Sequence, residues 1–299
     1  MTFPWLLRGD ERHPPALTFP RTAPARWFLQ KDMPMPHLPL FLARRSRPAL
    51  LAALFLTGGG LSAAEARTLA QIQQSGVLRV ATPGDLPPFA MTDGSRFSGY
   101  EIELLQAVAA TLGLKVEVQR VAADGLIKAL QDDRADVALG ALGVTSTREH
   151  KVDCTVPTAC AGVSVASLNP ALQKHTDLAG KKIGVGAGSI MHSYVQKLPF
   201  EKQVQVYKST GDVLLAVLSK AVDATFAYTV MEPAIKRTYP KVKVYFGPEL
   251  WSVPIGFMVR EDNDSTRLAL NTALQNYFAT NSYAFLSAKH FGKDVRCKG

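Results

Sequence analysis

The chain has 299 residues, of which 47% are hydrophobic and 20% are charged. This composition is typical of globular proteins and excludes a chain that is disordered throughout. From residue 67 onward, about 26 basic and about 21 acidic residues leave a net charge of about +5, against +9 for the whole chain. Such a mild positive charge does not indicate a nucleic-acid partner.

Residues 1–66 carry the features of a secretory signal. A basic stretch at residues 44–47 precedes an apolar run at residues 48–61, and Ala64-Glu65-Ala66 supplies a small-x-small cleavage pattern. A membrane anchor is disfavoured because the run of about 14 residues falls short of the roughly 20 that span a bilayer. We therefore predict a signal peptide that is cleaved after Ala66.

The predicted signal bears on where translation starts, on the export route and on whether the mature protein carries a lipid anchor. Residues before Met33 are rich in Pro and Arg and show no periodicity, so Met33 or Met35 is the expected start. The pair Arg44-Arg45 leaves the twin-arginine export route open beside ordinary secretion. Because no cysteine follows the cleavage site as a lipid attachment residue, we predict a soluble periplasmic protein that is not a lipoprotein.

The three cysteines, Cys154, Cys160 and Cys297, all lie in the mature part. An oxidising compartment favours pairing two of them and leaving one free. The sequence leaves the pairing open, and it favours a structural disulfide, with Cys297 a candidate partner, over redox chemistry, because the spacing is far from Cys-x-x-Cys. The mature histidines show no metal-ligand spacing, and we expect no metal, no cofactor and no catalytic residue.

Short β-rich runs alternate with helical patterns after Arg67, which is typical of parallel sheets covered by helices. In a first unit we predict strand 77–82, helix 100–112, strand 115–121, a short helix at 124–130 and strand 136–139. In a second unit we predict strand 182–185, helix 189–197, strand 204–207, helix 211–218, strand 224–226, helix 230–238 and strand 242–246. An apolar strand at 255–259 and two helical stretches reaching Phe291 follow.

The last segment has no obvious sheet of its own, which predicts that the chain returns to its first unit. Lobe one then comprises residues 67–159 and 252–299, and lobe two comprises residues 160–251. The two connections between them would form a hinge.

Motifs in this order resemble a known family. They are Leu78–Thr82, Pro88-Phe89, Ser98–Leu104, Asp136–Ala138, the Thr145-x-x-Arg148 loop, Val152–Pro157, Leu178–Val185 with Gly188-Ser189, Val222–Ala224 and Phe291-Gly292. The chain resembles the bacterial extracellular solute-binding proteins of family 3, which bind polar amino acids for ABC transporters. The resemblance implies an α/β, type II periplasmic-binding-protein-like fold, in which each lobe has a small, mostly parallel sheet flanked by helices and two hinge strands join the lobes. It also implies a small-molecule ligand in the cleft, an inner-membrane ABC permease as partner and a monomeric state.

The resemblance assigns a carboxylate-binding half of the site. Arg148 aligns with the family arginine that grips the α-carboxylate of the ligand, which suits a guanidinium because it offers two parallel donors. The turn at Gly188 and Ser189 would offer backbone N–H groups to the same carboxylate. A solvated Arg148 is the alternative interpretation.

The other half of the site departs from the family. The aspartate that usually holds the α-ammonium is replaced by Tyr228, and the usual stacking aromatics correspond to Leu86 and Ala123. Hydroxyl positions correspond to Gly140, Ala141 and Gly143, and a threonine position to Ile190. We predict an apolar or aromatic carboxylate as ligand, or an amine held over the ring of Tyr228.

Several alternatives stay open on the sequence alone. Asp85 or Glu232 could bind the amine of an ordinary amino acid, and Tyr228 could be a buried core residue. An enzyme on the same fold, such as a cyclohexadienyl (prephenate or arogenate) dehydratase, would need a cleft acid to protonate a leaving hydroxyl, and no acid is placed for this. A non-transport accessory or sensor protein is the third alternative.

Overall fold

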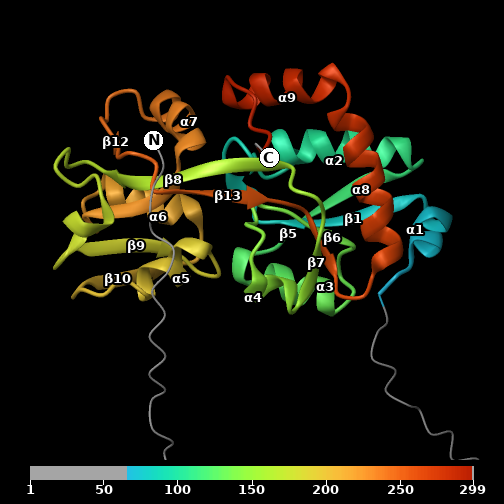
Figure 1. Ribbon diagram of the computed structural model, residues 1–299, viewed down its shortest axis with the longest axis horizontal. Coiled ribbons are helices and arrows are strands. Elements are labelled where there is room, and N and C mark those ends of the chain that lie inside the picture. The colour runs from blue at the N-terminus through green and yellow to red at the C-terminus, as the bar shows by residue number, and fades with distance from the viewer. Residues whose placement is uncertain (1–65, 298–299) are drawn as a thin grey trace, which may run out of the picture. The chain divides into compact units, whose positions relative to one another are not determined.

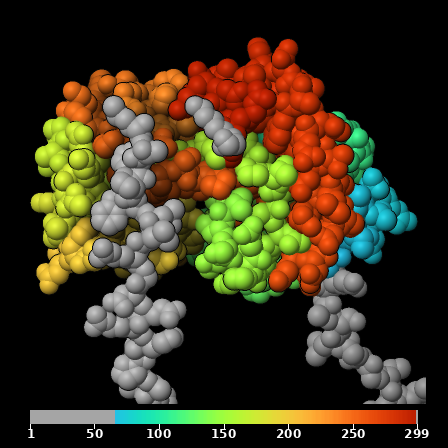
Figure 2. Space-filling view, in the orientation of Figure 1, coloured from blue at the N-terminus to red at the C-terminus, as the bar shows by residue number. Residues whose placement is uncertain are grey.

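The computed structural model describes residues 66–297, which fold into two lobes (Figure 1). The predicted signal peptide and start sites therefore lie outside the described residues, apart from Ala66. In the view of Figure 2, the yellow and orange surface of lobe two lies beside the green and red surface of lobe one. The type II, two-lobed α/β fold is confirmed.

The sheet of lobe one has five strands in the order β5-β1-β6-β14-β7. Strands β1 and β5 are parallel, as are β1 and β6, whereas β14 is antiparallel to both β6 and β7. The bounds are β1 Val77–Thr82, β5 Lys115–Arg120, β6 Val137–Ala138, β7 Val152–Cys154 and β14 Met258–Arg260.

Helices cover both faces of this sheet because its central strands β1 and β6 bury apolar side chains on two sides, whereas the edge strand β5 has no buried residue. On one face α2 packs against β5 and α8, and α1 packs against β1 and α8, while α3 covers β6, β14 and β7 on the other face. The helices are α1 Leu69–Ser75, α2 Tyr100–Thr111, η1 Ala123–Gly125, α3 Leu126–Gln131, α4 Ser146–Glu149, α8 Asp264–Phe278 and α9 Asn281–Phe291.

A small antiparallel sheet leads the chain from β1 into α2. It consists of β2 Asp85–Leu86, β3 Ala90–Thr92 and β4 Phe97–Ser98. Gly99 joins it to α2 with φ of 118°, and a Cβ at this position would lie 2.5 Å from the carbonyl oxygen of Phe89. Only glycine fits such a close backbone approach, which sets the start of α2 and thereby the position of Glu101.

The sheet of lobe two is mixed. Strands β10, β9 and β11 are parallel neighbours, and β8 is antiparallel to β11, β12 and β13. The strands are β8 Ala159–Ser167, β9 Lys182–Gly186, β10 Gln203–Tyr207, β11 Ala224–Tyr228, β12 Tyr245–Phe246 and β13 Trp251–Ile255. The helices are η2 His175–Leu178, α5 Ile190–Gln196, α6 Thr210–Leu218, η3 Thr229–Met231 and α7 Glu232–Thr238.

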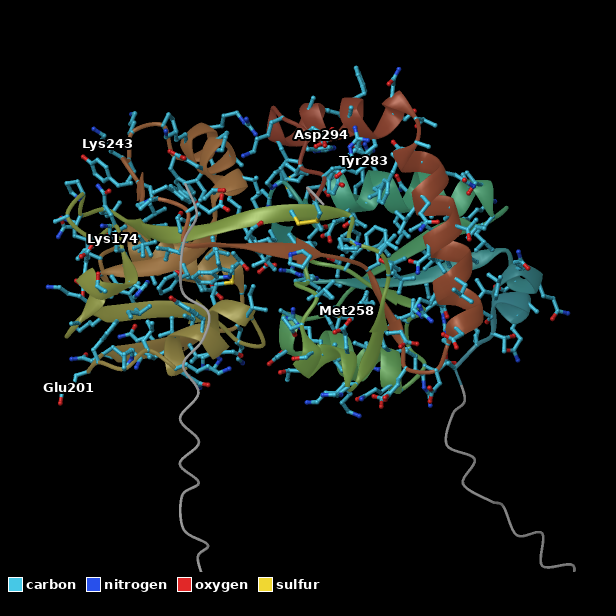
Figure 3. The ribbon with its side chains drawn as sticks, viewed as in Figure 1. Lys174, Glu201, Lys243, Met258, Tyr283 and Asp294 are labelled. Atoms are coloured by element: carbon cyan, nitrogen blue, oxygen red, sulfur yellow. A yellow bond between two sulfur atoms is a disulfide. The ribbon has the colours of Figure 1, made fainter. Side chains whose placement is uncertain are left out.

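Strands β8 and β13 run side by side between the lobes (Figure 1). Their register pairs Ala159 with Ile255 at one end and Val163 with Trp251 at the other. The disulfide Cys160–Cys297 fastens the C-terminal segment to the beginning of β8 and is the yellow bond in Figure 3. The residue bounds predicted for the two lobes stay a prediction.

One local expectation is wrong, and some elements were missed. The predicted strand 255–259 is interrupted at Gly256 and Phe257. Before this point β13 pairs with β8 of lobe two, and after it β14 pairs with β6 and β7 of lobe one. Helix α1 and strand β8 were not predicted, since β8 contains mostly small residues and only tertiary pairing marks it as a strand.

Candidate functional site

A cavity of about 110 Å³ lies between the lobes, and we call it the cleft cavity. It is placed where the parallel strands β9 and β10 and the neighbouring β11 of lobe two reach their carboxyl ends, which is where open α/β sheets bind ligands. Of the ten predicted ligand-binding residues it is lined by eight, namely Leu86, Ala123, Ala141, Arg148, Gly188, Ser189, Ile190 and Tyr228.

Arg148 is half-buried at the interface of the lobes. Its Nη1 donates to the carbonyl oxygen of Gly143 at 2.8 Å, and its Nη2 donates across the cleft to that of Gly188 at 2.9 Å. Burial lowers the pKa of Arg148, although a guanidinium stays protonated at neutral pH. No carboxylate within residues 66–297 forms an ion pair with it, so its charge is available to an anion.

The turn after β9 brings backbone close to Arg148. Ser189 caps α5, its Oγ accepting from the amide of His192 at 3.1 Å and donating to the carbonyl oxygen of Gly186 at 2.7 Å. Gly188 has φ of 70°, and a Cβ there would lie 3.1 Å from the Cα of Asp124 in lobe one. The two lobes therefore touch at this turn.

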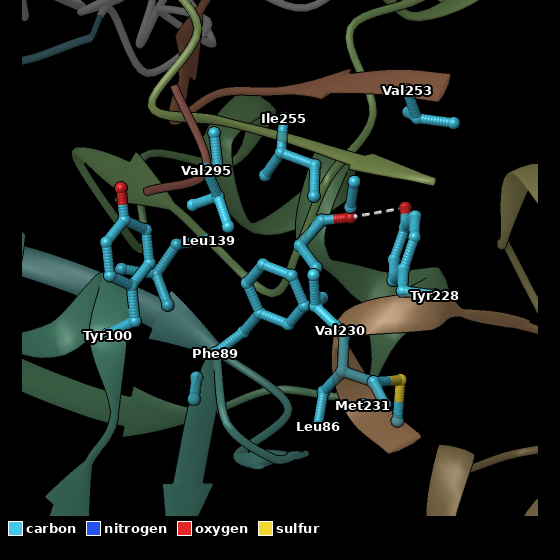
Figure 4. Packing of buried hydrophobic residues seen from close by; sticks show 14 of the residues in the cluster. Leu86, Phe89, Tyr100, Leu139, Tyr228, Val230, Met231, Val253, Ile255 and Val295 are labelled. Carbon is cyan, nitrogen blue, oxygen red and sulfur yellow. Dashed lines mark hydrogen bonds between the residues drawn. The ribbon is translucent and has the colours of Figure 1, made fainter. Parts of the chain in front are cut away.

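Tyr228 is buried, with 4% of its surface exposed, and its hydroxyl donates across the cleft to the carbonyl oxygen of Ala141 at 3.1 Å. Figure 4 shows this bond and the ring of Tyr228 beside Phe89, at 5.7 Å between ring centroids. Burial raises the pKa of Tyr228 well above its ordinary value, so the phenol is neutral. Tyr228 is therefore buried in the core and also lines the cavity, while its role in ligand binding stays a prediction.

Glu101 holds the other side of the same loop. Its Oε2 accepts from the amide of Ala141 at 2.8 Å, and its Oε1 is buried without a partner among the described residues. Burial raises the pKa of Glu101 to about 7. Ala141 has φ of 49°, a conformation that alanine rarely adopts, and the bonds from Glu101 and Tyr228 hold it there.

The cavity continues into lobe two along an apolar wall. This wall comprises residues of α6, η3, α7 and neighbouring strands, namely Val213, Leu214, Val217, Phe226, Met231, Ile235 and Val244. An apolar protein cavity of about 150 Å³ can hold benzene, so the cleft cavity is in the range that suits a small ring or branched chain.

Two predicted residues do not line the cavity. Asp85 instead accepts from the amide of Thr210 at 2.7 Å, which links lobe one to the start of α6. Gly143 contributes only its carbonyl oxygen to Arg148, and a Cβ there would collide with Val253. Glu232 is also outside the lining, and it pairs with Lys236.

Sequence reasoning missed Lys208 and the apolar wall. Lys208 follows β10 directly and is the only charged lining residue besides Arg148 within the described part of the chain. Its place at the carboxyl end of a parallel strand was the signal that could have found it. The wall was unrecognisable in advance, because residues of α6 and α7 that face a cavity have the same pattern as residues that face a core.

The described residues contain no group of three or more His, Cys, Asp or Glu that could hold a metal. Cys154 is a free thiol, and burial raises its pKa to about 11, which leaves it a poor nucleophile. None of the helices between residues 66 and 297 has the length and hydrophobicity of a membrane span.

Comparison with known proteins gives the family. Residues 78–293 match the model for bacterial extracellular solute-binding proteins, family 3. The chain belongs to this family. The solute-binding protein is 27% identical over 253 residues to the probable amino-acid-binding protein YxeM of Bacillus subtilis, with 83% of this chain and 93% of that protein covered. It is 24% identical to the L-cystine-binding protein TcyJ of Escherichia coli over 85% of this chain and 97% of that one.

Solved structures agree with the fold of this solute-binding protein. An ancestral arginine-binding protein bound to arginine superposes with a TM-score of 0.69 at 30% identity, covering 73% of this chain and 99% of that one. An ancestral amino acid-binding protein described as a precursor of cyclohexadienyl dehydratase has a TM-score of 0.68 at 26% identity, covering 75% and 99% of the two chains. The cyclohexadienyl dehydratase of Pseudomonas aeruginosa is 34% identical, but over only 36% of this chain and 41% of that enzyme.

Proposed function

We propose that the cleft cavity binds a small carboxylate with an apolar or aromatic body and no charged amine, and that the protein delivers it to an ABC permease. One observation carries this proposal. The charged lining residues of the cavity are Arg148 and Lys208, and no acidic residue of the described chain lines it. A lining of this kind favours an anion and leaves an ammonium group without a charged partner.

The carboxylate would bind at Arg148. The guanidinium has five N–H donors in a planar fork, and the two bonds to Gly143 and Gly188 use only two of them. Partial burial strengthens a charge-assisted bond, which contributes about 1.5–3 kcal/mol. The family resemblance assigned the same role to this residue.

The α-ammonium group of an amino acid would have no acidic partner among the described lining residues of the cavity. The hydroxyl of Tyr228 already bonds Ala141, and the carboxylates of Asp85 and Glu101 accept from the amides of Thr210 and Ala141. The apolar wall of α6 and α7 would receive the remainder of the ligand. These contacts disfavour the alternative in which Asp85 takes over the amine.

The proposal is one of binding and not of catalysis. A dehydratase would need a carboxylic acid beside the leaving hydroxyl, and the lining residues provide none. The relatives named as amino-acid-binding proteins support a transport role in the periplasm. We further propose that the protein is exported by its signal peptide, carries no lipid anchor and acts as a monomer.

The test compares ligand pairs that differ only in the α-amine, by calorimetry on the full chain. We expect 4-methylpentanoate to bind more tightly than leucine, and 3-phenylpropanoate more tightly than phenylalanine. Arg148→Ala should weaken carboxylate binding by about 100-fold or more, since two bonds of about 1.5 kcal/mol each are lost. Arg237→Ala removes an exposed arginine outside the cavity and is the matched control. Tighter binding of the amino acids would overturn the proposal.

A further inference from the structure

A second hollow, larger than the cleft cavity, lies at the hinge, and we call it the hinge groove. Its volume is about 570 Å³. One wall is the segment of α4 in lobe one, the other is α5 in lobe two, and β13 forms the floor, an arrangement that can be followed in Figure 1. Arg148 and Gly188 border both hollows, so the bond between them separates the groove from the cleft cavity.

The groove is positively charged. Lys151 lines it from lobe one and Lys197 from lobe two, and Arg148 is a third basic lining residue. No acidic residue is among the described lining residues, and neither lysine forms an ion pair within residues 66–297. Glu149 of α4 is exposed but does not line the groove. The opposed lysines therefore present unneutralised charge from two lobes to one space.

Neutral groups in the groove suit the oxygen atoms of an anion. Hydroxyls of Ser146 and Ser193 line opposite walls, and Ser252 lies on the floor. The rings of Tyr194 and Trp251, which also line the groove, contact each other at 4.1 Å between centroids with an angle of 38° between their planes, and they provide an apolar surface. Cations and hydroxyls with no acceptor carboxylate are the chemistry that recognises a small oxyanion with several charges.

We propose that the hinge groove binds a small multivalent oxyanion, a phosphate or a polycarboxylate, and that this anion strengthens binding in the cleft cavity. Lys151 and Lys197 belong to different lobes, and like charges repel when the lobes approach. An oxyanion between them replaces this repulsion by two attractions and favours the conformation with the lobes in contact. Because the cavity also takes residues from both lobes, the two sites are coupled, and the coupling is reciprocal. This last step rests on the proposed function.

The first test needs no cavity ligand. Thermal unfolding of the full chain is followed while sodium phosphate or sodium citrate replaces sodium chloride at constant ionic strength. We expect a stabilisation that saturates with anion concentration. The anion with the lower apparent dissociation constant shows whether the groove prefers a phosphate or a polycarboxylate. In Lys151→Ala/Lys197→Ala the apparent dissociation constant should rise by about tenfold, the loss of roughly 0.7 kcal/mol for each exposed charge pair.

The control is Lys115→Ala/Lys241→Ala, which removes one exposed lysine from each lobe outside the groove. Equal responses of the control and groove variants, or no saturable response of the unaltered protein, would overturn the oxyanion site. If anion binding is lost only in the groove variant but the affinity of a cavity ligand does not change with phosphate or citrate, the coupling is wrong. Lys151 and Lys197 line the groove and not the cleft cavity, so the difference between the groove and control variants reports on the groove. Failure of the proposed cavity ligand therefore leaves this difference unchanged and is distinguishable.

Discussion

The carboxyl of Glu101 should make the stability of this protein depend on pH in a direction opposite to that of most acids. The side chain is fully buried, with no basic partner among the described residues, and burial raises its pKa from 4.5 to about 7. A carboxyl with a raised pKa stays protonated in the folded protein when the unfolded chain has already lost the proton. Its contribution is therefore fully present below pH 4.5 and is lost as the pH rises to about 7.

The magnitude follows from the pKa difference. A difference of about 2.5 at about 1.36 kcal/mol per pKa unit corresponds to about 3 kcal/mol. Glu101→Gln retains an oxygen that accepts from the amide of Ala141 but has no proton to lose. Between pH 4.5 and pH 8, the free energy of unfolding of the variant should therefore rise by about 3 kcal/mol relative to that of the unaltered protein.

Urea unfolding followed by circular dichroism at several pH values measures the difference between the two proteins, in which other titrating groups cancel. In thermal unfolding the same change is about 6–12 °C in relative Tm. Glu103→Gln, a more exposed acid two residues along α2, is the matched control for removing a carboxylate from this helix. A constant difference between Glu101→Gln and the unaltered protein across this pH range would refute the reasoning.

Three further changes test contacts of the hinge and the site. Tyr228→Phe removes the bond to Ala141 and should weaken ligand binding about fivefold in calorimetry, because one neutral hydrogen bond contributes about 1 kcal/mol. Cys297→Ser opens the disulfide to Cys160, which spans 137 residues, and should lower the free energy of unfolding by about 2–5 kcal/mol in urea. Asp136→Asn leaves two arginines without their buried carboxylate and should cost about 3–5 kcal/mol in the same assay, with the ligand affinity unchanged.

Each of these three predictions has an outcome that would contradict it. Unchanged affinity in Tyr228→Phe would mean that the bond does not form in the liganded protein. Cys154→Ser should leave stability nearly unaltered, so an equal loss in both cysteine variants would argue against a role of the disulfide. For Asp136, burial opposes ionisation but the bonds from Arg67 and Arg79 dominate and lower its pKa, so its contribution should disappear only as the pH falls below about 4. Asp136→Asn with normal stability at neutral pH would contradict the pairing.

Elements with strong local patterns were predictable from the sequence. Strand β1 has the predicted bounds of 77–82, and α2 ends one residue before its predicted end. Strand β9 and helix α5 were found within one residue because a Gly-rich turn separates them and Ser189 caps the helix. The family motifs extended these local predictions to the two-lobed fold.

The site was predictable only in part. The family resemblance identified Arg148 and Tyr228, and the turn between a strand and a helix identified Ser189, as candidate site residues, and all three line the cavity. Asp85 also lies shortly after a strand but does not line the cavity, because its carboxylate accepts from the amide of Thr210 in the other lobe. A local pattern cannot show which of two nearby partners a short acidic side chain will meet.

The sequence by itself, with its family motifs, determined the fold class, the alternation of its main strands and helices, and the replacement of an acid by Tyr228. Tertiary structure alone decided that Cys160 pairs with Cys297, that the hydroxyl of Tyr228 reaches Ala141, and that lysines of both lobes share the hinge groove. The physical reason is that propensity and periodicity act over a few residues along the chain. These contacts join residues between 46 and 137 positions apart, and they form only when the two sheets meet.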